Sequence, residues 1–200
     1  NKFRGGGQTC VCANRIFVHE KVADAFAGKL ADRVAGLTVG NGLESGVDIG
    51  PLINRAGFDK VRRHLEDALA KGARLIAGAR PEDLGEGLFF PPTVVLGVDR
   101  SMDCYREETF GPLVPMAVFR GEEEVIAAGN DTEFGLASYV FTADAERAQR
   151  VAAGGKYSQC SGPTFAQIVL YYALVCNVVT DPLQVQSPLL GVCSPVELLG

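Results

Sequence analysis

The alternation of apolar and polar positions predicts a regular series of helices and strands over residues 11–153. Apolar residues recur at four-residue steps at Val22, Phe26, Leu30 and Val34. This spacing predicts a helix over residues 21–37, because residues four apart lie on one helix face. Residues 54–71 show a similar one-sided pattern. They are bounded by Asn54, which suits a helix N-cap, and by Gly72, which suits a helix C-terminus.

Short apolar runs predict strands between these helices. The expected strands cover residues 16–18, 74–77, 93–98, 114–119 and 138–141, and two further helices are expected over residues 122–128 and 143–153. Pro115 weakens the fourth strand, because proline cannot donate to a sheet ladder. Strands that alternate with helices are typical of a layered α/β fold with a largely parallel sheet. We predict that fold for residues 1–153.

The pattern changes after Gly154. The chain has 19 basic and 24 acidic residues, yet only Lys156, Asp181 and Glu197 follow this glycine. Residues 165–179 are nearly uncharged, but they are fewer than the roughly 20 that a membrane helix needs. A buried strand or helix and an aggregation-prone segment both remain open. We therefore divide the chain into a domain at 1–153 and a tail of uncertain structure at 154–200, which a shifted reading frame would produce.

Composition narrows the class of partner and the compartment. A net charge of −5 and a pI of about 5.1 argue against nucleic acid, which needs a basic face. The sequence shows no signal peptide. The six cysteines are Cys10, Cys12, Cys104, Cys160, Cys176 and Cys193. Without secretory features they suggest reduced thiols in the cytoplasm or a mitochondrial matrix. Neither Cys-x-x-Cys nor paired histidines occur, so no metal site is expected, and His19 and His64 are predicted on the surface.

Cys10 is the first candidate for chemistry, because three glycines, Gly5–Gly7, stand shortly before it. Glycines let a backbone approach a ligand closely. If Cys10 opens a helix, the backbone N–H groups there favour the thiolate, which is the nucleophilic form. The residues alone leave the alternative open that Cys10 is a small buried apolar side chain.

Four motifs carry a resemblance to a known family. Phe3-x-x-x-Gly7-Gln8-x-Cys10 resembles the cysteine motif of the aldehyde dehydrogenase superfamily, and residues 1–15 resemble succinate-semialdehyde dehydrogenases in particular. The other three motifs are Gly50-Pro51-Leu52-Ile53, Glu107-Glu108-Thr109-Phe110-Gly111-Pro112, and Asn130 followed by Phe134-Gly135-Leu136-Ala137. Four motifs in the family's order are more specific than any one of them, and the resemblance extends over residues 1–153.

The resemblance implies an oxidoreductase that uses NAD or NADP. Cys10 would attack the aldehyde to give a thiohemiacetal, which passes a hydride to the nicotinamide and leaves a thioester for water to hydrolyse. Glu108 would bind the nicotinamide ribose, and Phe110 would lie beside it. Arg4 would hold the distal carboxylate of the substrate through paired hydrogen bonds. The residues alone leave Glu108 and Arg4 open as solvated surface charges.

Cys12 follows Cys10 by two positions, which suggests a redox switch in which the two thiols pair and block the nucleophile. Such a tight ring would be strained and easily reduced. A second packed thiol is the alternative.

The resemblance also limits what this chain does alone. It implies that the nucleotide-binding domain, the general-base glutamate and the oxyanion amide precede residue 1, so the isolated chain is expected not to turn over aldehydes. It implies a small aldehyde as partner, homo-oligomers of the full-length protein, and no nucleic acid or membrane. Glutarate semialdehyde as the substrate, or a catalytically silent chain, remain alternatives. A thiol hydrolase would need His19 or His64 beside Cys10.

Overall fold

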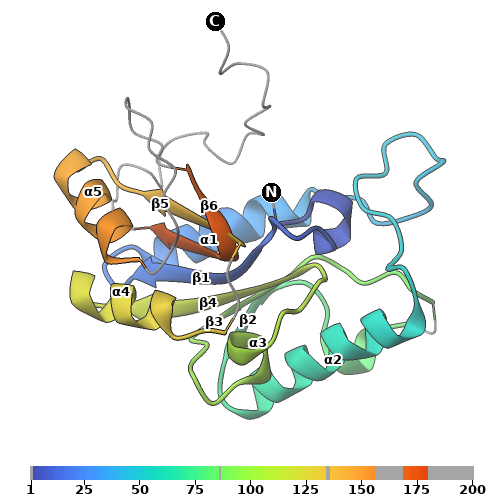
Figure 1. Cartoon of the computed structure of the whole chain (residues 1–200). Helices are drawn as coiled ribbons and strands as arrows, with labels where there is room; N and C mark the ends of the chain where they lie inside the picture. The colour runs from blue at the N-terminus through green and yellow to red at the C-terminus, as the bar shows by residue number, and fades with distance from the viewer. Residues whose placement is uncertain (1, 86, 134–135, 156–168, 180–200) are drawn as a thin grey trace, which may run out of the picture.

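The structure is a computed structural model that describes residues 2–85, 87–133, 136–155 and 169–179, and its centre is a six-stranded sheet (Figure 1). The strands are β1 (Ala13–His19), β2 (Arg74–Ala77), β3 (Thr93–Leu96), β4 (Leu113–Phe119), β5 (Leu136–Phe141) and β6 (Val169–Val179). Their order across the sheet is β2-β3-β4-β1-β6-β5. All neighbours are parallel except β2, which pairs antiparallel with β3. The predicted α/β fold with a largely parallel sheet is confirmed.

The predicted helices are all present, with ends shifted by a few residues. They are α1 (Ala23–Ala35), α2 (Arg55–Ala70), α4 (Glu122–Asn130) and α5 (Ala145–Gly154). The short helix α3 (Asp103–Arg106) and the 3-10 turns η1 (Arg4–Gly7) and η2 (Pro81–Asp83) were not predicted, because three or four residues show no periodicity. Asn54 caps α2 as expected, since its Oδ1 accepts from the Gly57 N–H at 2.8 Å.

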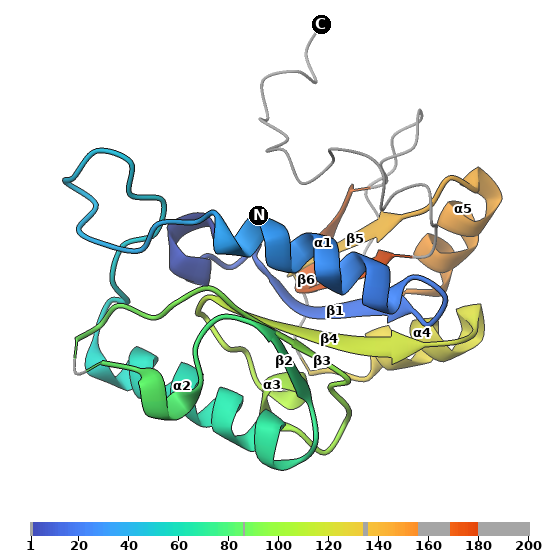
Figure 2. The ribbon, with the colours of Figure 1, turned by 180° about the vertical axis from the view of Figure 1, so that it is seen from behind.

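Side chains that alternate along the central strands build two apolar cores, one on each face of the sheet. Phe17, Val95 and Leu113 pack on the face covered by α2. Ile16 and Val94 pack on the opposite face against α1, because successive strand residues point to opposite sides. The two views show α1 and α2 on opposite sides of the sheet (Figures 1 and 2). The result is a helix–sheet–helix sandwich.

β3 is shorter than predicted, and β4 contains a proline, both for local reasons. β3 ends at Leu96 instead of residue 98, because Gly97 takes a φ of +85° and turns the chain away. Pro115 is accommodated within β4, although β4 lies between two other strands. The ladder with β1 begins only at Met116, so the proline stands at the edge of that pairing.

The segment after Gly154 contributes one described element. Val169–Val179 forms β6, which pairs parallel with both β1 and β5 inside the sheet. Of the alternatives for residues 165–179, a strand is therefore observed over residues 169–179. The division of the chain at residues 153 and 154 stays a prediction. No helix among the described residues is long and apolar enough to cross a bilayer.

Candidate active site

Cys10 lies in a turn between η1 and β1, and its side chain is exposed. The turn is closed by a hydrogen bond from the Cys12 N–H to the Thr9 carbonyl at 3.0 Å. Cys10 therefore does not open a helix, and that condition of the prediction was wrong. The physical reason is that β1 begins three positions later, at Ala13, which leaves no room for a helix.

The glycines before Cys10 make a left-handed turn that packs backbone against backbone. Gly5, Gly6 and Gly7 have φ values of +57°, +66° and +74°. A Cβ on Gly7 would lie 2.2 Å from the carbonyl oxygen of Gly111, and a Cβ on Gly111 would lie 2.2 Å from a methyl group of Val61 on α2. The cysteine loop, meaning residues 4–12, thus packs closely on the segment around Gly111, and that segment packs closely on α2.

Gln8 holds this turn against the loop that contains the second motif. Its side-chain Oε1 accepts from the Ile53 N–H at 2.9 Å, and its Nε2 donates to the Gly5 carbonyl at 3.1 Å. The motif at residues 50–53 is therefore brought to the cysteine loop by the fold, although it is distant in sequence.

A surface hollow brings the predicted nucleophile and the predicted cofactor residues together. Its lining consists of Lys2, Gly7, Thr9, Cys10, Cys12, Asn14, Glu108 and Phe110. Glu108 is half-buried, and Phe110 is 40% exposed and has a φ of +48°. A left-handed φ in a bulky residue is strained, and such strain is typical of functional sites. Arg4 is exposed and is not part of this lining, so its role in binding substrate stays a prediction.

The thiols whose side chains are described lie in different environments. Cys10 is exposed, whereas Cys12 is 6% exposed. The Cys12 sulfur contacts the Thr9 hydroxyl at 2.8 Å and donates to the Arg4 carbonyl at 3.8 Å. Burial raises the pKa of Cys104 to about 12, so this thiol stays protonated. Exposure therefore favours Cys10 as the reactive thiol.

Lys2 is a buried cation beside these thiols. Burial lowers the pKa of its ammonium to about 8, against a smaller opposing effect of Cys12 and Cys104. Part of the Lys2 population is therefore neutral near pH 8.

His64 was predicted on the surface, and that prediction was wrong. Its side chain is fully buried, because it lies on the same face of α2 as Val61 and Leu65. His19 is half-buried at the end of β1, and its Nδ1 accepts from the Lys21 N–H at 3.2 Å. Neither histidine lines the hollow with Cys10, so the thiol hydrolase alternative gains no support.

Asn14 is a site residue that the sequence did not reveal. Its side-chain amide bonds to the backbone at Glu107 and at Thr109, the two neighbours of Glu108. The predicted strand began only at residue 16, so the place of Asn14 inside β1 and its burial are visible only in the structure.

Two of the lining residues have side chains of the kind that a nicotinamide dinucleotide would need. The carboxylate of Glu108 accepts hydrogen bonds, as a ribose diol requires, and the exposed ring of Phe110 offers an apolar surface to a planar ring. No group of three or more His, Cys, Asp or Glu among the described residues could hold a metal ion.

Comparison with known proteins gives consistent matches. The sequence pattern of the aldehyde dehydrogenase family matches residues 1–162. A glutarate-semialdehyde dehydrogenase of Pseudomonas putida is 52% identical over 157 residues, which cover 78% of this chain and 32% of that protein. The NADP(+) succinate-semialdehyde dehydrogenase GabD of Escherichia coli is 48% identical, with the same two coverages.

Solved structures of related proteins also superpose on this chain. An oxidoreductase from Marinobacter aquaeolei superposes with a TM-score of 0.78 at 72% identity, over 84% of this chain and 37% of that one. A succinate-semialdehyde dehydrogenase from Burkholderia pseudomallei has a TM-score of 0.74 at 48% identity, over 90% of this chain and 34% of that one. The chain thus spans about a third of the length of these relatives.

Proposed function

The chain belongs to the aldehyde dehydrogenase family, and on that premise we propose that it is the part of an NAD(P)-dependent semialdehyde dehydrogenase that carries the nucleophile. Cys10 is the nucleophile, Glu108 and Phe110 contact the nicotinamide end of the cofactor, and Arg4 binds the distal anionic group of the substrate. The observation that supports this assignment best is that Cys10, Glu108 and Phe110 line one hollow although the chain separates them widely.

The residues of this chain supply covalent capture and orientation. The Cys10 thiolate adds to the aldehyde carbon, and the carbonyl oxygen takes up a proton to complete a thiohemiacetal. Glu108 and Phe110 hold one face of the hollow for the cofactor, which when bound supplies the hydride acceptor. The turn built by Gly5–Gly7 fixes Cys10 against the segment that carries Glu108. Aldehyde capture is therefore the step that this chain can perform alone.

Capture is tested by protection of Cys10 from alkylation. We expect succinate semialdehyde to slow the labelling of Cys10 by iodoacetamide, read by peptide mass spectrometry, while the labelling of Cys104 stays unchanged.

Two results would contradict the proposal. Equal labelling of Cys10 with and without aldehyde would remove it as the nucleophile. Turnover at 340 nm that survives in Cys10→Ser would place the chemistry elsewhere.

The substrate class is an aldehyde with an anionic group at its other end, with succinate semialdehyde as the first choice. The support is that relatives named for glutarate, succinate and aspartate semialdehydes match this chain at 46–52% identity. Glutarate semialdehyde remains the alternative, because one methylene is worth only about 1–3 kcal/mol of discrimination. Protection by both semialdehydes and none by propanal at equal concentration would support an anion-binding role for Arg4. Arg4→Met is expected to erase the difference.

A redox switch between Cys10 and Cys12 is proposed for the same loop. Cys10 is exposed to oxidants, and Cys12 lies buried two positions away. Peroxide is expected to convert Cys10 to a sulfenic acid. The Cys12 sulfur then attacks the Cys10 sulfur, the S–OH bond breaks, and the hydroxyl group leaves as water with the thiol proton to give a disulfide. Mass spectrometry should find the linked pair and its reversal by dithiothreitol. If only sulfenic or sulfinic Cys10 is found, the two thiols do not pair and Cys12 is simply a packed side chain.

A further inference from the structure

We propose that Asn14 and His64 are positioning residues for Glu108: they hold its two neighbours so that its carboxylate stays beside Cys10. The role of Glu108 rests on the proposed function, but its placement does not. The inference therefore concerns the Glu107–Phe110 segment, meaning those four residues, and the two side chains that bracket it.

Asn14 bonds to the backbone on both sides of Glu108. Its Nδ2 donates to the Glu107 carbonyl at 2.9 Å, and its Oδ1 accepts from the Thr109 N–H at 2.7 Å. Asn14 is 6% exposed and belongs to β1, the strand that follows directly on the turn of Cys10. The Asn14 side chain thus connects the start of β1, which follows the turn of Cys10, to the backbone on both sides of Glu108.

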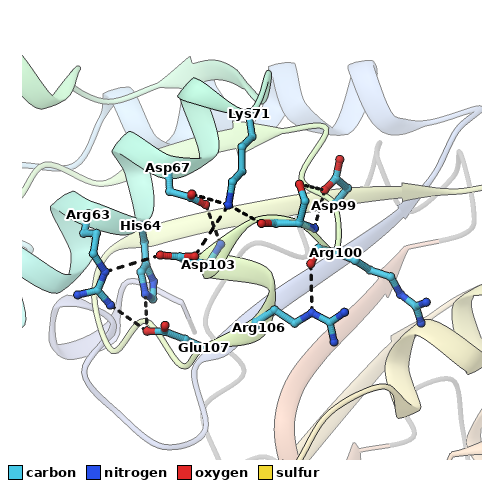
Figure 3. A network of polar contacts seen from close by, with 10 residues as sticks. Arg63, His64, Asp67, Lys71, Asp99, Arg100, Asp103, Arg106 and Glu107 are labelled. Carbon is cyan, nitrogen blue, oxygen red and sulfur yellow. Dashed lines mark hydrogen bonds and ion pairs between the residues drawn. The ribbon is translucent and has the colours of Figure 1, made fainter.

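His64 holds the side chains of the same two neighbours. Its Nε2 lies 3.1 Å from Glu107 Oε2, and its Nδ1 lies 3.1 Å from Thr109 Oγ1. A carboxylate only accepts, so Nε2 carries the proton and Nδ1 accepts from the Thr109 hydroxyl. A neutral imidazole satisfies both contacts, which suits a fully buried side chain. Figure 3 shows Glu107 approached by both His64 and Arg63, the latter at 2.9 Å.

The segment needs such support because its end is strained. Phe110 has a φ of +48°, and this left-handed conformation is unfavourable in a residue with a Cβ, because the Cβ then lies too close to the following carbonyl oxygen. Four hydrogen bonds to Glu107 and Thr109 offset that strain. Because Glu108 stands between these two anchored residues, its own position follows from theirs.

The test uses Cys10 in the 200-residue chain as a probe of the nearby carboxylate. Iodoacetate carries a negative charge and iodoacetamide does not. The rate of alkylation of Cys10 by iodoacetate divided by the rate with iodoacetamide is therefore lowered by a nearby anion. The fraction of Cys10 that is thiolate affects both rates equally and cancels. Glu108→Gln is expected to raise this ratio by roughly two- to fivefold, as for charges several Å apart near a surface. His64→Leu and Asn14→Leu are expected to move the ratio toward the Glu108→Gln value.

Matched variants separate positioning from general stability. His64→Gln keeps an N–H group for Glu107 and should restore part of the ratio. Thr109→Val keeps the shape of the side chain but removes the hydroxyl donor, so it should raise the ratio in a chain that stays folded. His19→Leu, at the other histidine, should leave the ratio unchanged.

The proposal is overturned if Glu108→Gln leaves the ratio unchanged, because Glu108 then does not face Cys10. It is also overturned if folded His64→Leu and Thr109→Val chains keep the original ratio. If His64→Leu does not fold, the Thr109→Val result decides alone. Aldehyde protection of Cys10 is a separate readout, so failure of the proposed function is distinguishable from failure of this inference.

The same contacts give a pH profile. Burial lowers the pKa of His64 below its usual value of 6.5, and the charges of Lys60 and Arg63 lower it further, whereas the hydrogen bond to Glu107 raises it. A charge on His64 would in turn lower the pKa of Asp67. The unfolded chain therefore binds more protons, and stability present above pH 6.5 is lost as the pH falls toward the folded-state value. The free energy of unfolding should decline from pH 7.5 to pH 5.5 in urea titrations. His64→Gln should flatten that decline, and an unchanged slope would contradict a buried neutral imidazole.

Discussion

Replacing Gly7 by alanine is expected to destabilise the chain by about 3 kcal/mol or more, which would be a large loss for one methyl group. The added Cβ would lie 2.2 Å from the carbonyl oxygen of Gly111 and 3.0 Å from that of Lys2. Both contacts are with backbone atoms, which cannot rotate away as a side chain can. The φ of +74° adds strain of its own. The melting temperature should fall by roughly 6–12 °C for a chain of this size.

Gly5→Ala is the matched control, because Gly5 also has a positive φ, of +57°, but has room for a methyl group. Its Cβ would lie 3.6 Å from the nearest atom, a methyl carbon of Thr9. This variant should lose only the cost of the left-handed conformation, about 1–2 kcal/mol. Thermal unfolding of both variants, followed by circular dichroism, measures the difference. Equal losses would mean that the cysteine loop does not pack rigidly on the segment around Gly111.

The Gly7→Ala result bears on function as well as stability. Relief of the clash requires the cysteine loop to move away from Gly111, and Cys10 would move with it. Its protection by succinate semialdehyde should therefore weaken, while the iodoacetamide rate without aldehyde stays measurable because Cys10 is exposed.

The sequence predicted the helices and central strands well, because their periodicities are long and their boundaries carry ordinary signals. The α2 helix shows this most clearly, since Asn54 and Gly72 mark its ends and a single apolar face sets its orientation. The same apolar face contains His64, at three residues from Val61 and next to Leu65. A stricter use of the helical period would have placed His64 in the interior.

The candidate site was less accessible to sequence reasoning. Family resemblance named Cys10, Glu108 and Phe110. The sequence could state only what would follow if Cys10 opened a helix, and the structure has a turn there. Asn14 was missed because its partners, Glu107 and Thr109, lie far along the chain, and periodicity describes only local neighbours. The tight approach of Gly7 to Gly111 is a tertiary contact of the same kind.

Arg15→Met is expected to cost about 3 kcal/mol, although it removes a buried charge. The guanidinium is 2% exposed and ends helix α4 by donating to three backbone carbonyls. The distances are 2.9 Å to Ala128, 2.9 Å to Gly129 and 3.3 Å to Asp131. Methionine leaves these acceptors without their charged donor at the end of a helix, where carbonyls lack partners along the helix.

Two further features set the size of this effect. The guanidinium lies over the rings of Phe17 and Tyr105, at 5.5 and 5.3 Å from the ring centroids, and such contacts contribute about 0.5–2 kcal/mol each. Its buried Nε has no hydrogen-bond partner among the described residues, which offsets part of that gain. Methionine retains some of the apolar packing, so the loss reflects mainly the hydrogen bonds to the carbonyls.

Arg74→Met provides the comparison, because Arg74 pairs with Asp24 on the surface, where both side chains are mostly exposed. An exposed ion pair is worth at most about 1 kcal/mol. Urea titration of the two variants should therefore separate them by about 2 kcal/mol or more. Equal losses in the free energy of unfolding would show that the contacts of Arg15 with α4 stabilise the chain no more than a surface ion pair does. The cost of burying the guanidinium would then cancel the gain from its three hydrogen bonds. A loss confined to Arg15→Met would show that Arg15 stabilises the junction between β1 and α4.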